Sequence, residues 1–280
     1  MLISGKWGPE AELGLAHIKQ HRSPAGANIT GRTGQAMAKA DRVTRIPPNL
    51  SCFTCQSRER SEWCALRNDD LDLLNRSKIT VNYRPGQNVY GQGNPCSGIY
   101  CIEEGTIAIR RVDAQGNSIL IRLAHAGQTV GYRDFFGGEG HTGSAEALSP
   151  ARVCHVDGQA LRQMLSHNPA LGLNFLTHLA EDLDNAEESI LQNSALSVRT
   201  RLVHLLLTLK DRFADATDDG TIVLSLPLAR QDLAALLGTR PETIARTIHA
   251  LETDSVATFS GRTVRIPDLD MLLNEIEPYI

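Results

Sequence analysis

Short apolar runs separated by glycines fill the middle of the chain. The runs Ile99–Ile102, Thr106–Arg111 and Ile119–Leu123 are rich in β-forming residues, and glycines bound them. Runs of this length, with turn signals about every ten residues, are typical of short strands packed as two sheets. We therefore expect a β-sandwich or a double-sheet roll, and residues 152–157 give a late strand of the same roll.

The apolar spacing becomes helical after these strands. Residues three and four positions apart alternate over about two and a half heptads, which is the pattern of helices that pair along their length. This seam consists of Leu176, Leu179, Leu183, Ala186, Ile190 and the polar Asn193. A helix packed against its own domain is the alternative. The outer face carries acidic residues and no basic one: Glu181, Asp182, Asp184, Glu187 and Glu188. Two such helices would repel each other, so their pairing would be weak and easy to switch.

The last third of the chain predicts helices about a tight turn. Residues 198–214 give an amphipathic helix, and residues 229–251 give two shorter helices that meet at Gly238, with Pro241 opening the second. A residue without Cβ suits the turn, and proline suits the first position of a helix. The inward faces are apolar: Leu233, Leu236 and Leu237, then Ile244, Ile248 and Leu251. Two β-rich runs within 255–266 follow as a hairpin, so the pattern predicts a helix-turn-helix with a wing.

The polar residues of this motif can be assigned to DNA. With the second helix in the major groove, Glu242 can accept from a cytosine amino group and Arg246 can donate to both acceptors of a guanine. A surface ion pair between Glu242 and Arg246 is the alternative. Four further residues are placed for phosphates: Arg230, Gln231, Thr243 and Arg262. Arg240 can reach either a phosphate or a base.

Composition limits the class of protein. The 280 residues are 41% hydrophobic and 21% charged, enough for two modest domains. Residues 1–48 lack apolar periodicity, so we expect a disordered tail, with Met37 as an alternative start to Met1. The chain has no run of about 18 apolar residues and no signal-peptide core, so we expect a cytoplasmic protein without membrane contact. The net charge of −4 argues against nonspecific coating of nucleic acid but allows sequence-specific binding.

Cysteines crowd into one short stretch ahead of the strands. Three of the six, Cys52, Cys55 and Cys64, lie within SCFTCQSRERSEWCAL, residues 51–66. In a reducing compartment, clustered cysteines bind metal more often than they form disulfides. Three thiolates alone leave one position of a four-ligand site open, so a fourth cysteine is needed elsewhere in the chain.

Taken together, these elements resemble the Crp/Fnr family of bacterial transcription regulators. The glycine-punctuated roll, the long helix, and ARQDLAALLG followed by RPETIAR carry the resemblance over residues 66 to about 270. It implies an α+β chain, with a cyclic-nucleotide-binding-like β-roll, a parallel dimerisation helix and a C-terminal winged helix-turn-helix. It also implies a homodimer on a palindromic site in double-stranded DNA and contact with RNA polymerase. The expected parts are the tail to residue 48, the cysteine segment and roll (49–168), the dimerisation helix (169–197) and the DNA-binding domain (198–280).

The roll departs from the cyclic-AMP branch of the family. In that branch a Gly-Glu pair binds the ribose and an Arg-Ser pair binds the phosphate. Here Tyr132 stands in place of the glutamate, and Gly143 and Ser144 stand in place of Arg-Ser. A buried phosphate without its arginine would keep an uncompensated charge. We therefore do not expect cyclic AMP as the ligand.

The cysteines are similar to those of the oxygen-sensing, Fnr-type branch. Its members bind a 4Fe-4S cluster through an N-terminal cysteine group and one cysteine late in the roll, and here ARVCHV supplies Cys154. The resemblance implies Cys52, Cys55, Cys64 and Cys154 as ligands, and oxygen, nitric oxide or cellular redox state as the signal. The eight residues between Cys55 and Cys64 exceed the gap of the best-known members, but a longer loop adds little entropic cost to closure. Trp63 would shield the cluster.

Other readings of the same residues stay open. The four cysteines could bind zinc or form a thiol–disulfide switch, with the roll sensing a small molecule or haem. Cys96 is a substitute ligand, whereas Cys101 is expected in the core as a small hydrophobe. His155, next to Cys154 in a strand, should point to the opposite face. An electron carrier or metalloenzyme is disfavoured by the helix-turn-helix, and no acid/base pair, nucleophile triad or phosphate loop is apparent. We expect no enzyme.

Overall fold

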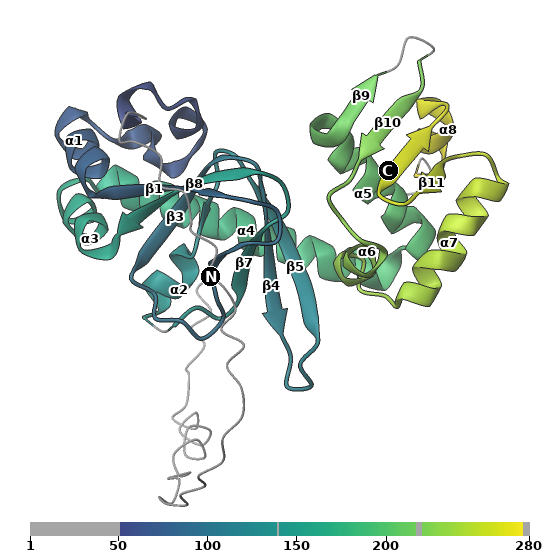
Figure 1. The fold of residues 1–280 in the computed structure, drawn as a ribbon, viewed down its shortest axis with the longest axis horizontal. Helices are drawn as coiled ribbons and strands as arrows, with labels where there is room; N and C mark the ends of the chain where they lie inside the picture. The colour runs from purple at the N-terminus through teal and green to yellow at the C-terminus, as the bar shows by residue number, and fades with distance from the viewer. Residues whose placement is uncertain (1–50, 139, 217–219, 277–280) are drawn as a thin grey trace, which may run out of the picture. The chain divides into compact units, whose positions relative to one another are not determined.

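The computed structural model describes residues 51–138, 140–216 and 220–276 (Figure 1). The expected tail, residues 1–48, and both alternative starts lie outside these residues.

Eight strands form the two sheets of the roll. The first sheet has the order β1-β8-β3-β6 and the second the order β2-β7-β4-β5. The first comprises β1 (Lys78–Tyr83), β8 (Ala151–Asp157), β3 (Gly98–Glu104) and β6 (Thr129–Val130). The second comprises β2 (Asn88–Tyr90), β7 (Ser144–Ala147), β4 (Thr106–Val112) and β5 (Ser118–His125). The four runs expected as strands from the sequence coincide with β3, β4, β5 and β8, and the double-sheet roll is confirmed.

The two faces of the first sheet are buried in different ways. Residues on its inner face, such as Ile102 and Val153, pack against Ile107 and Ala145 of the second sheet. The outer face is covered by helices. These are the short 3-10 helices η1 (Cys52–Thr54), η2 (Gln56–Arg60) and η3 (Glu62–Ala65), and the α-helices α1 (Asn68–Ser77), α2 (Tyr132–Gly137) and α3 (Gly158–His167). Ile99 and Val156 of the sheet lie in this outer core with Trp63, Leu161 and Met164. Side chains that alternate along β3 and β8 therefore face two separate cores.

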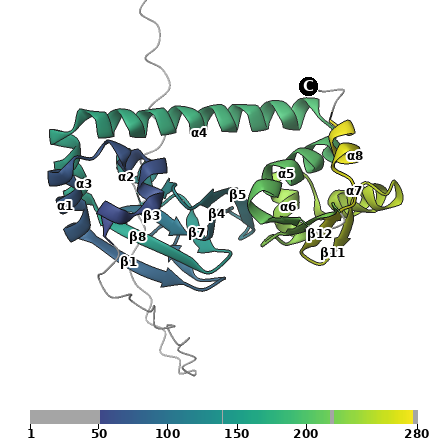
Figure 2. The same ribbon diagram turned by 90° about the horizontal axis from the view of Figure 1, so that it is seen from above.

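The long helix is a single element, α4 (Pro169–Ala195), visible as one unbroken helix in Figure 2. The Asn168 side chain caps its first turn by accepting from the Leu171 backbone N–H, and Pro169 opens the helix. Leu171 and Phe175 are buried against the roll. Leu179 of the predicted seam is partly buried against the roll's outer core, whereas the other five seam residues are exposed: Leu176, Leu183, Ala186, Ile190 and Asn193.

One charge on α4 is not where the helical pattern places it. The pattern predicts Asp182 on the outer acidic face, but this residue is half-buried and accepts a hydrogen bond from the hydroxyl of Tyr132 in the roll. Arg122 of β5 lies 3.6 Å from the same carboxylate. The prediction is wrong for this residue because helical spacing alone does not say which turns meet a neighbouring domain. The other four acidic residues are exposed.

The C-terminal part is a winged helix. Its elements are α5 (Val198–Phe213), β9 (Ala214–Ala216), β10 (Ile222–Ser225), α6 (Arg230–Leu236), α7 (Pro241–Thr253), β11 (Thr258–Ser260), β12 (Thr263–Ile266) and α8 (Leu269–Asn274). Its sheet has the order β11-β12-β10-β9. Gly238, between α6 and α7, has a φ of +57°, a left-handed conformation that glycine adopts without strain. Leu233, Ile244 and Ile248 are buried as their spacing predicts. The predicted fold class is therefore confirmed.

Candidate cysteine site and DNA-binding surface

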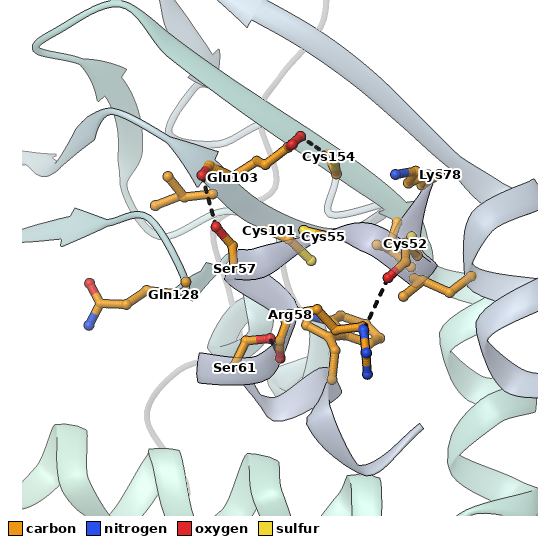
Figure 3. A pocket seen from close by; sticks show the side chains of 15 residues that line it. Cys52, Cys55, Ser57, Arg58, Ser61, Lys78, Cys101, Glu103, Gln128 and Cys154 are labelled. Carbon is orange, nitrogen blue, oxygen red and sulfur yellow. Dashed lines mark hydrogen bonds between the residues drawn. The ribbon is translucent and has the colours of Figure 1, made fainter. Parts of the chain in front are cut away.

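Four cysteines from three parts of the chain line one cavity (Figure 3). Cys52 belongs to η1, Cys55 follows it, Cys101 lies on β3 and Cys154 lies on β8. The cavity has a volume of about 40 Å³, and a single water molecule needs only about 10–15 Å³. We call this space the cysteine cavity. All four cysteines are free thiols.

The strand register brings two of these sulfurs together. Cys101 and Cys154 are direct partners in the antiparallel pair β3–β8, so their side chains leave the sheet on the same face. On the far side of β8, Thr80 of β1 pairs with Cys154, and its hydroxyl oxygen lies 3.3 Å from the Cys154 sulfur. His155 falls on the opposite face, where its Nε2 lies 3.3 Å from the Ser97 hydroxyl.

Hydrogen bonds hold the residues around Cys52 and Cys55 over this sheet face. The backbone N–H of Cys52 donates to the Asn75 side chain of α1 at 2.9 Å, and the Cys52 carbonyl accepts from Arg58 Nε at 3.0 Å. The Ser57 hydroxyl donates to the carbonyl of Glu103 at the end of β3, at 2.9 Å (Figure 3). These contacts hold the N-terminal thiols close to Cys101 and Cys154.

Burial disfavours the charged thiolate forms of Cys52, Cys101 and Cys154. It raises the pKa of Cys52 and of Cys154, and it raises the pKa of Cys101 well above its ordinary value. The Lys78 ammonium, which hydrogen-bonds the Cys52 sulfur, opposes this shift in the Cys52 pKa. Burial therefore favours the neutral thiols of Cys52, Cys101 and Cys154, and a bound metal cation would compensate the charge of their thiolates.

Cys64, the remaining predicted ligand, lies elsewhere. Its side chain is exposed, and its sulfur accepts from the Asn174 side chain of α4 at 3.5 Å. The preceding residue, Trp63, points inward instead, lines the cysteine cavity and is 2% exposed. The structure thus brings together Cys52, Cys55 and Cys154 of the predicted set but not Cys64.

Cys96 and Cys101 lie in different surroundings. Cys101, expected as a core hydrophobe, faces the cysteine cavity, whereas the Cys96 sulfur bonds the carbonyl of Gly98 at 3.3 Å and does not line that cavity. Sequence alone could have found Cys101 only through the pairing of β3 with β8, which places it opposite Cys154.

The donor set can be tested against the metal groups that thiolates bind. Within residues 51–138, 140–216 and 220–276, no three His, Cys, Asp or Glu side chains converge closely enough to bind one ion. A zinc ion needs its sulfurs about 2.3 Å from a single centre. In a 4Fe-4S cluster four cysteines bind four different irons, so their sulfurs stand further apart. Four thiols around one cavity fit this second arrangement better.

The cysteine segment, residues 51–65, is also fastened to α4. The buried carboxylate of Glu62 pairs with His178 of α4 and accepts from the Thr129 hydroxyl of β6 at 2.7 Å. The Asn174 side chain donates to the Glu62 carbonyl at 3.0 Å. The rings of Trp63 and Phe175 meet edge to face, 5.7 Å between centroids. The sulfur site and the long helix are thus one packed unit.

The part of the roll that corresponds, by the family resemblance, to a nucleotide site is nearly filled. Its cavity, lined by Arg111, Tyr132, Asp134 and Gly143 among others, has a volume of about 20 Å³. That is room for about one water molecule. Tyr132 is fully buried there and bonds Asp182. The side chain that replaces the family's glutamate occupies the site itself.

The predicted DNA contacts lie on the winged helix. Glu242, Arg246, Arg230, Gln231, Arg240 and Arg262 are all exposed, and Thr243 is half-buried. Arg246 makes its hydrogen bond to the Thr243 hydroxyl, at 3.4 Å, rather than to Glu242. The base-reading interpretation therefore does not compete with a Glu242–Arg246 ion pair. One contact could not be foreseen: Asp232 of α6 accepts from Arg110 of β4 at 2.7 Å.

Comparisons with known proteins agree with this arrangement. Residues 80–168 match the cyclic nucleotide-binding domain, and residues 200–275 match the Crp-like helix-turn-helix domain. The chain is 25% identical over 231 residues to the transcriptional activator protein FnrL of Cereibacter sphaeroides, covering 80% of this chain and 91% of that one. It is 25% identical over 225 residues to the anaerobic regulatory protein of Pasteurella multocida, covering 78% and 81%.

A solved structure shows the same fold. A Crp/Fnr-family transcriptional regulator of Thermus thermophilus superposes with a TM-score of 0.60 at 24% identity, over 71% of this chain and 98% of that one. A roll, a long helix and a winged helix-turn-helix together define a DNA-binding transcription regulator, not an enzyme. The chain belongs to the Crp/Fnr family. In its described residues we find no helix of the length and apolarity that a membrane span requires.

Proposed function

We propose that this regulator senses oxygen, nitric oxide or cellular redox state through a 4Fe-4S cluster and binds a palindromic DNA site as a homodimer. The cysteine cavity carries the proposal, because it gathers Cys52, Cys55, Cys154 and a fourth thiol over one sheet face. Relatives named as an anaerobic regulatory protein and as FnrL support it. When bound, such a cluster would supply a centre that reacts with oxygen, held by the thiolates of these cysteines.

The chain's own contacts link that site to dimerisation. Thiols that ligate a shared group hold the cysteine segment against the roll, and Glu62 and Trp63 of that segment hold α4. A fixed α4 presents Leu176, Leu183 and Ile190, all exposed, to a second copy. If these thiols were released from the shared group, this support would loosen, and the acidic residues near the seam would favour separation.

Dimerisation sets the spacing of the two helices that enter the DNA grooves. Two recognition helices, α7 in each subunit, must stand about 34 Å apart to enter successive major grooves. Glu242 and Arg246 then read a G·C pair in each half-site, and Arg230, Gln231, Thr243, Arg240 and Arg262 contact the phosphates or neighbouring bases. Coupling between a sensor and a DNA site is typically about 1–3 kcal/mol. Bound in this way, the regulator acts in the cytoplasm and contacts RNA polymerase, as the family resemblance implies.

Metal analysis of the full chain tests the proposal. Anaerobically purified protein is expected to be brown, with about four irons and four sulfides per chain. It should retain a palindromic operator in a gel shift and lose affinity on exposure to air. The Cys154→Ala variant should lose the iron and the response to air together. A colourless, iron-free protein that still binds its operator as a dimer would refute iron–sulfur sensing and leave only the DNA-binding function.

A roll that senses a small molecule or haem is the alternative. The cavity of about 20 Å³ beside Tyr132 is too small for such a ligand without rearrangement. In that case the cysteines would bind zinc or form a thiol switch, and the same metal analysis would find zinc or free thiols.

A further inference from the structure

We propose that Cys101, and not Cys64, is the fourth sulfur ligand of the cysteine cavity. The inference rests on the proposed iron–sulfur function and deepens it, because it changes which residues hold the group. The N-terminal segment would then supply two ligands, Cys52 and Cys55, and the roll would supply two, Cys101 and Cys154.

The register of the sheet carries the argument. Cys101 and Cys154 face each other across the β3–β8 pair, so their sulfurs emerge on one face from neighbouring strands. Both line the cavity to which Cys52 and Cys55 also point from the N-terminal segment (Figure 3). No rearrangement of the backbone is needed to bring these four side chains to one space.

Cys64 cannot join them without unpacking the segment that carries it. In η3 the inward positions are taken by Glu62 and Trp63, which are 5% and 2% exposed. Turning η3 so that Cys64 entered the cavity would expel the Trp63 ring from Phe175 and from the Thr129 hydroxyl, to which its Nε1 donates at 3.2 Å. It would also break the bond from the Asn174 side chain to the Glu62 carbonyl.

The ligation step is balanced by proton release. Each of the four thiols that binds iron loses one proton to solvent as its sulfur–iron bond forms, with no change in the oxidation state of the sulfur. Cys64 forms no bond to iron and keeps its exposed position beside α4. Its reactivity should therefore depend on the cluster far less than that of a ligand.

Matched serine variants of the full chain test the assignment. Cys101→Ser, Cys64→Ser and Cys96→Ser are purified without oxygen, and iron, sulfide and visible absorption are measured per folded chain. The Cys64 and Cys96 variants should keep the wild-type iron content, whereas the Cys101 variant should lose more than half of it. Loss of iron in the Cys64 variant, or retention in the Cys101 variant, overturns the proposal. Iron-free wild-type protein would instead remove the proposed function itself.

Labelling of the wild-type protein avoids any folding defect of the Cys101 variant. Anaerobic, iron-loaded protein is treated with iodoacetamide before and after iron removal by a chelator, and modified cysteines are identified by mass spectrometry. Cys64 is exposed whether or not the segment is held, so its alkylation rate should change less than about threefold. Cys101 should become at least tenfold more reactive once iron is removed and the segment that covers it is released. Protection of Cys64 by iron, with no protection of Cys101, gives the opposite assignment.

Discussion

The DNA-binding end and the cysteine end of this chain are assembled in different ways. The predicted DNA contacts, from Arg230 to Arg262, come from one continuous segment whose helices and turn follow local spacing. The four cavity cysteines span residues 52 to 154 and come from a 3-10 segment and two strands. A site within one local motif can be specified by that motif, whereas a site across a sheet depends on strand pairing.

The two ends also differ in how their side chains are held. The predicted DNA-contacting residues are exposed apart from the half-buried Thr243, so changing them should alter binding with little effect on folding. The cysteine segment is packed through Trp63 and Glu62, which are buried. Changes there should lower stability and disturb the sulfur site together.

The largest expected effect is at Trp63. Replacing it with alanine removes a ring that is 2% exposed, contacts Phe175 and donates to Thr129, and should lower the free energy of unfolding by about 3–5 kcal/mol. Urea denaturation of the full chain measures this. Phe53→Ala, at a ring that is 43% exposed in the same segment, should cost about 0.5 kcal/mol or less. Equal losses in both variants would mean that Trp63 does not anchor the segment.

The second largest effect is expected at the apolar seam of α4, the helix that connects the two ends. Leu183→Ala removes contacts from both helices of the proposed dimer and should weaken association by about 2 kcal/mol per helix. Analytical ultracentrifugation gives the dimer dissociation constant. Leu191→Ala is the matched control, because both leucines are 59% exposed but Leu191 is off the seam. Equal weakening by the two substitutions would contradict the heptad pairing.

A smaller effect is expected at the DNA-binding end. Arg246→Ala should reduce discrimination for guanine at one half-site position by about 1–3 kcal/mol, while the free energy of unfolding stays within about 0.5 kcal/mol. Binding titrations with the operator and with single-base variants measure it. Arg262→Ala, a predicted phosphate contact, should weaken all these sequences alike and reduce the salt dependence. If the Arg246 variant keeps the preference for guanine, the proposed position of α7 on DNA is wrong.

The smallest effect concerns pH at the joint between the segment and α4. The hydrogen bond with Glu62 raises the pKa of His178; Asp182 raises it too, while burial and Arg122 of β5 lower it. A raised folded pKa means that this contribution is complete below the unfolded value of about 6.5 and is lost as pH rises through the folded value. The stability difference between wild type and His178→Gln should therefore shrink from about 1 kcal/mol as pH rises from about 6 to 9. A difference that grows with pH would show that the pair is not charged.

Features set by local sequence could be predicted, whereas features set by distant neighbours could not. The strands, the long helix and the helix-turn-helix followed from spacing, because turns, caps and apolar periodicity act over a few residues. The positions of Cys101 and Asp182 did not, because each depends on a neighbour far along the chain: Cys154 across β3–β8, and Tyr132 in the roll. Cys64 lies close to Cys52 and Cys55 in sequence, but Trp63 takes the inward position of the same turn.

Glu62 lies at a joint of three elements. Its carboxylate is shared between Thr129 of β6 and His178 of α4, and its backbone carbonyl accepts from Asn174 one turn earlier on that helix. If the segment lifts from the roll, all these contacts are lost together, because they converge on one residue. The contacts between the cysteine segment and α4 should consequently form or break together. We expect two states of α4, held and released, with few molecules in between.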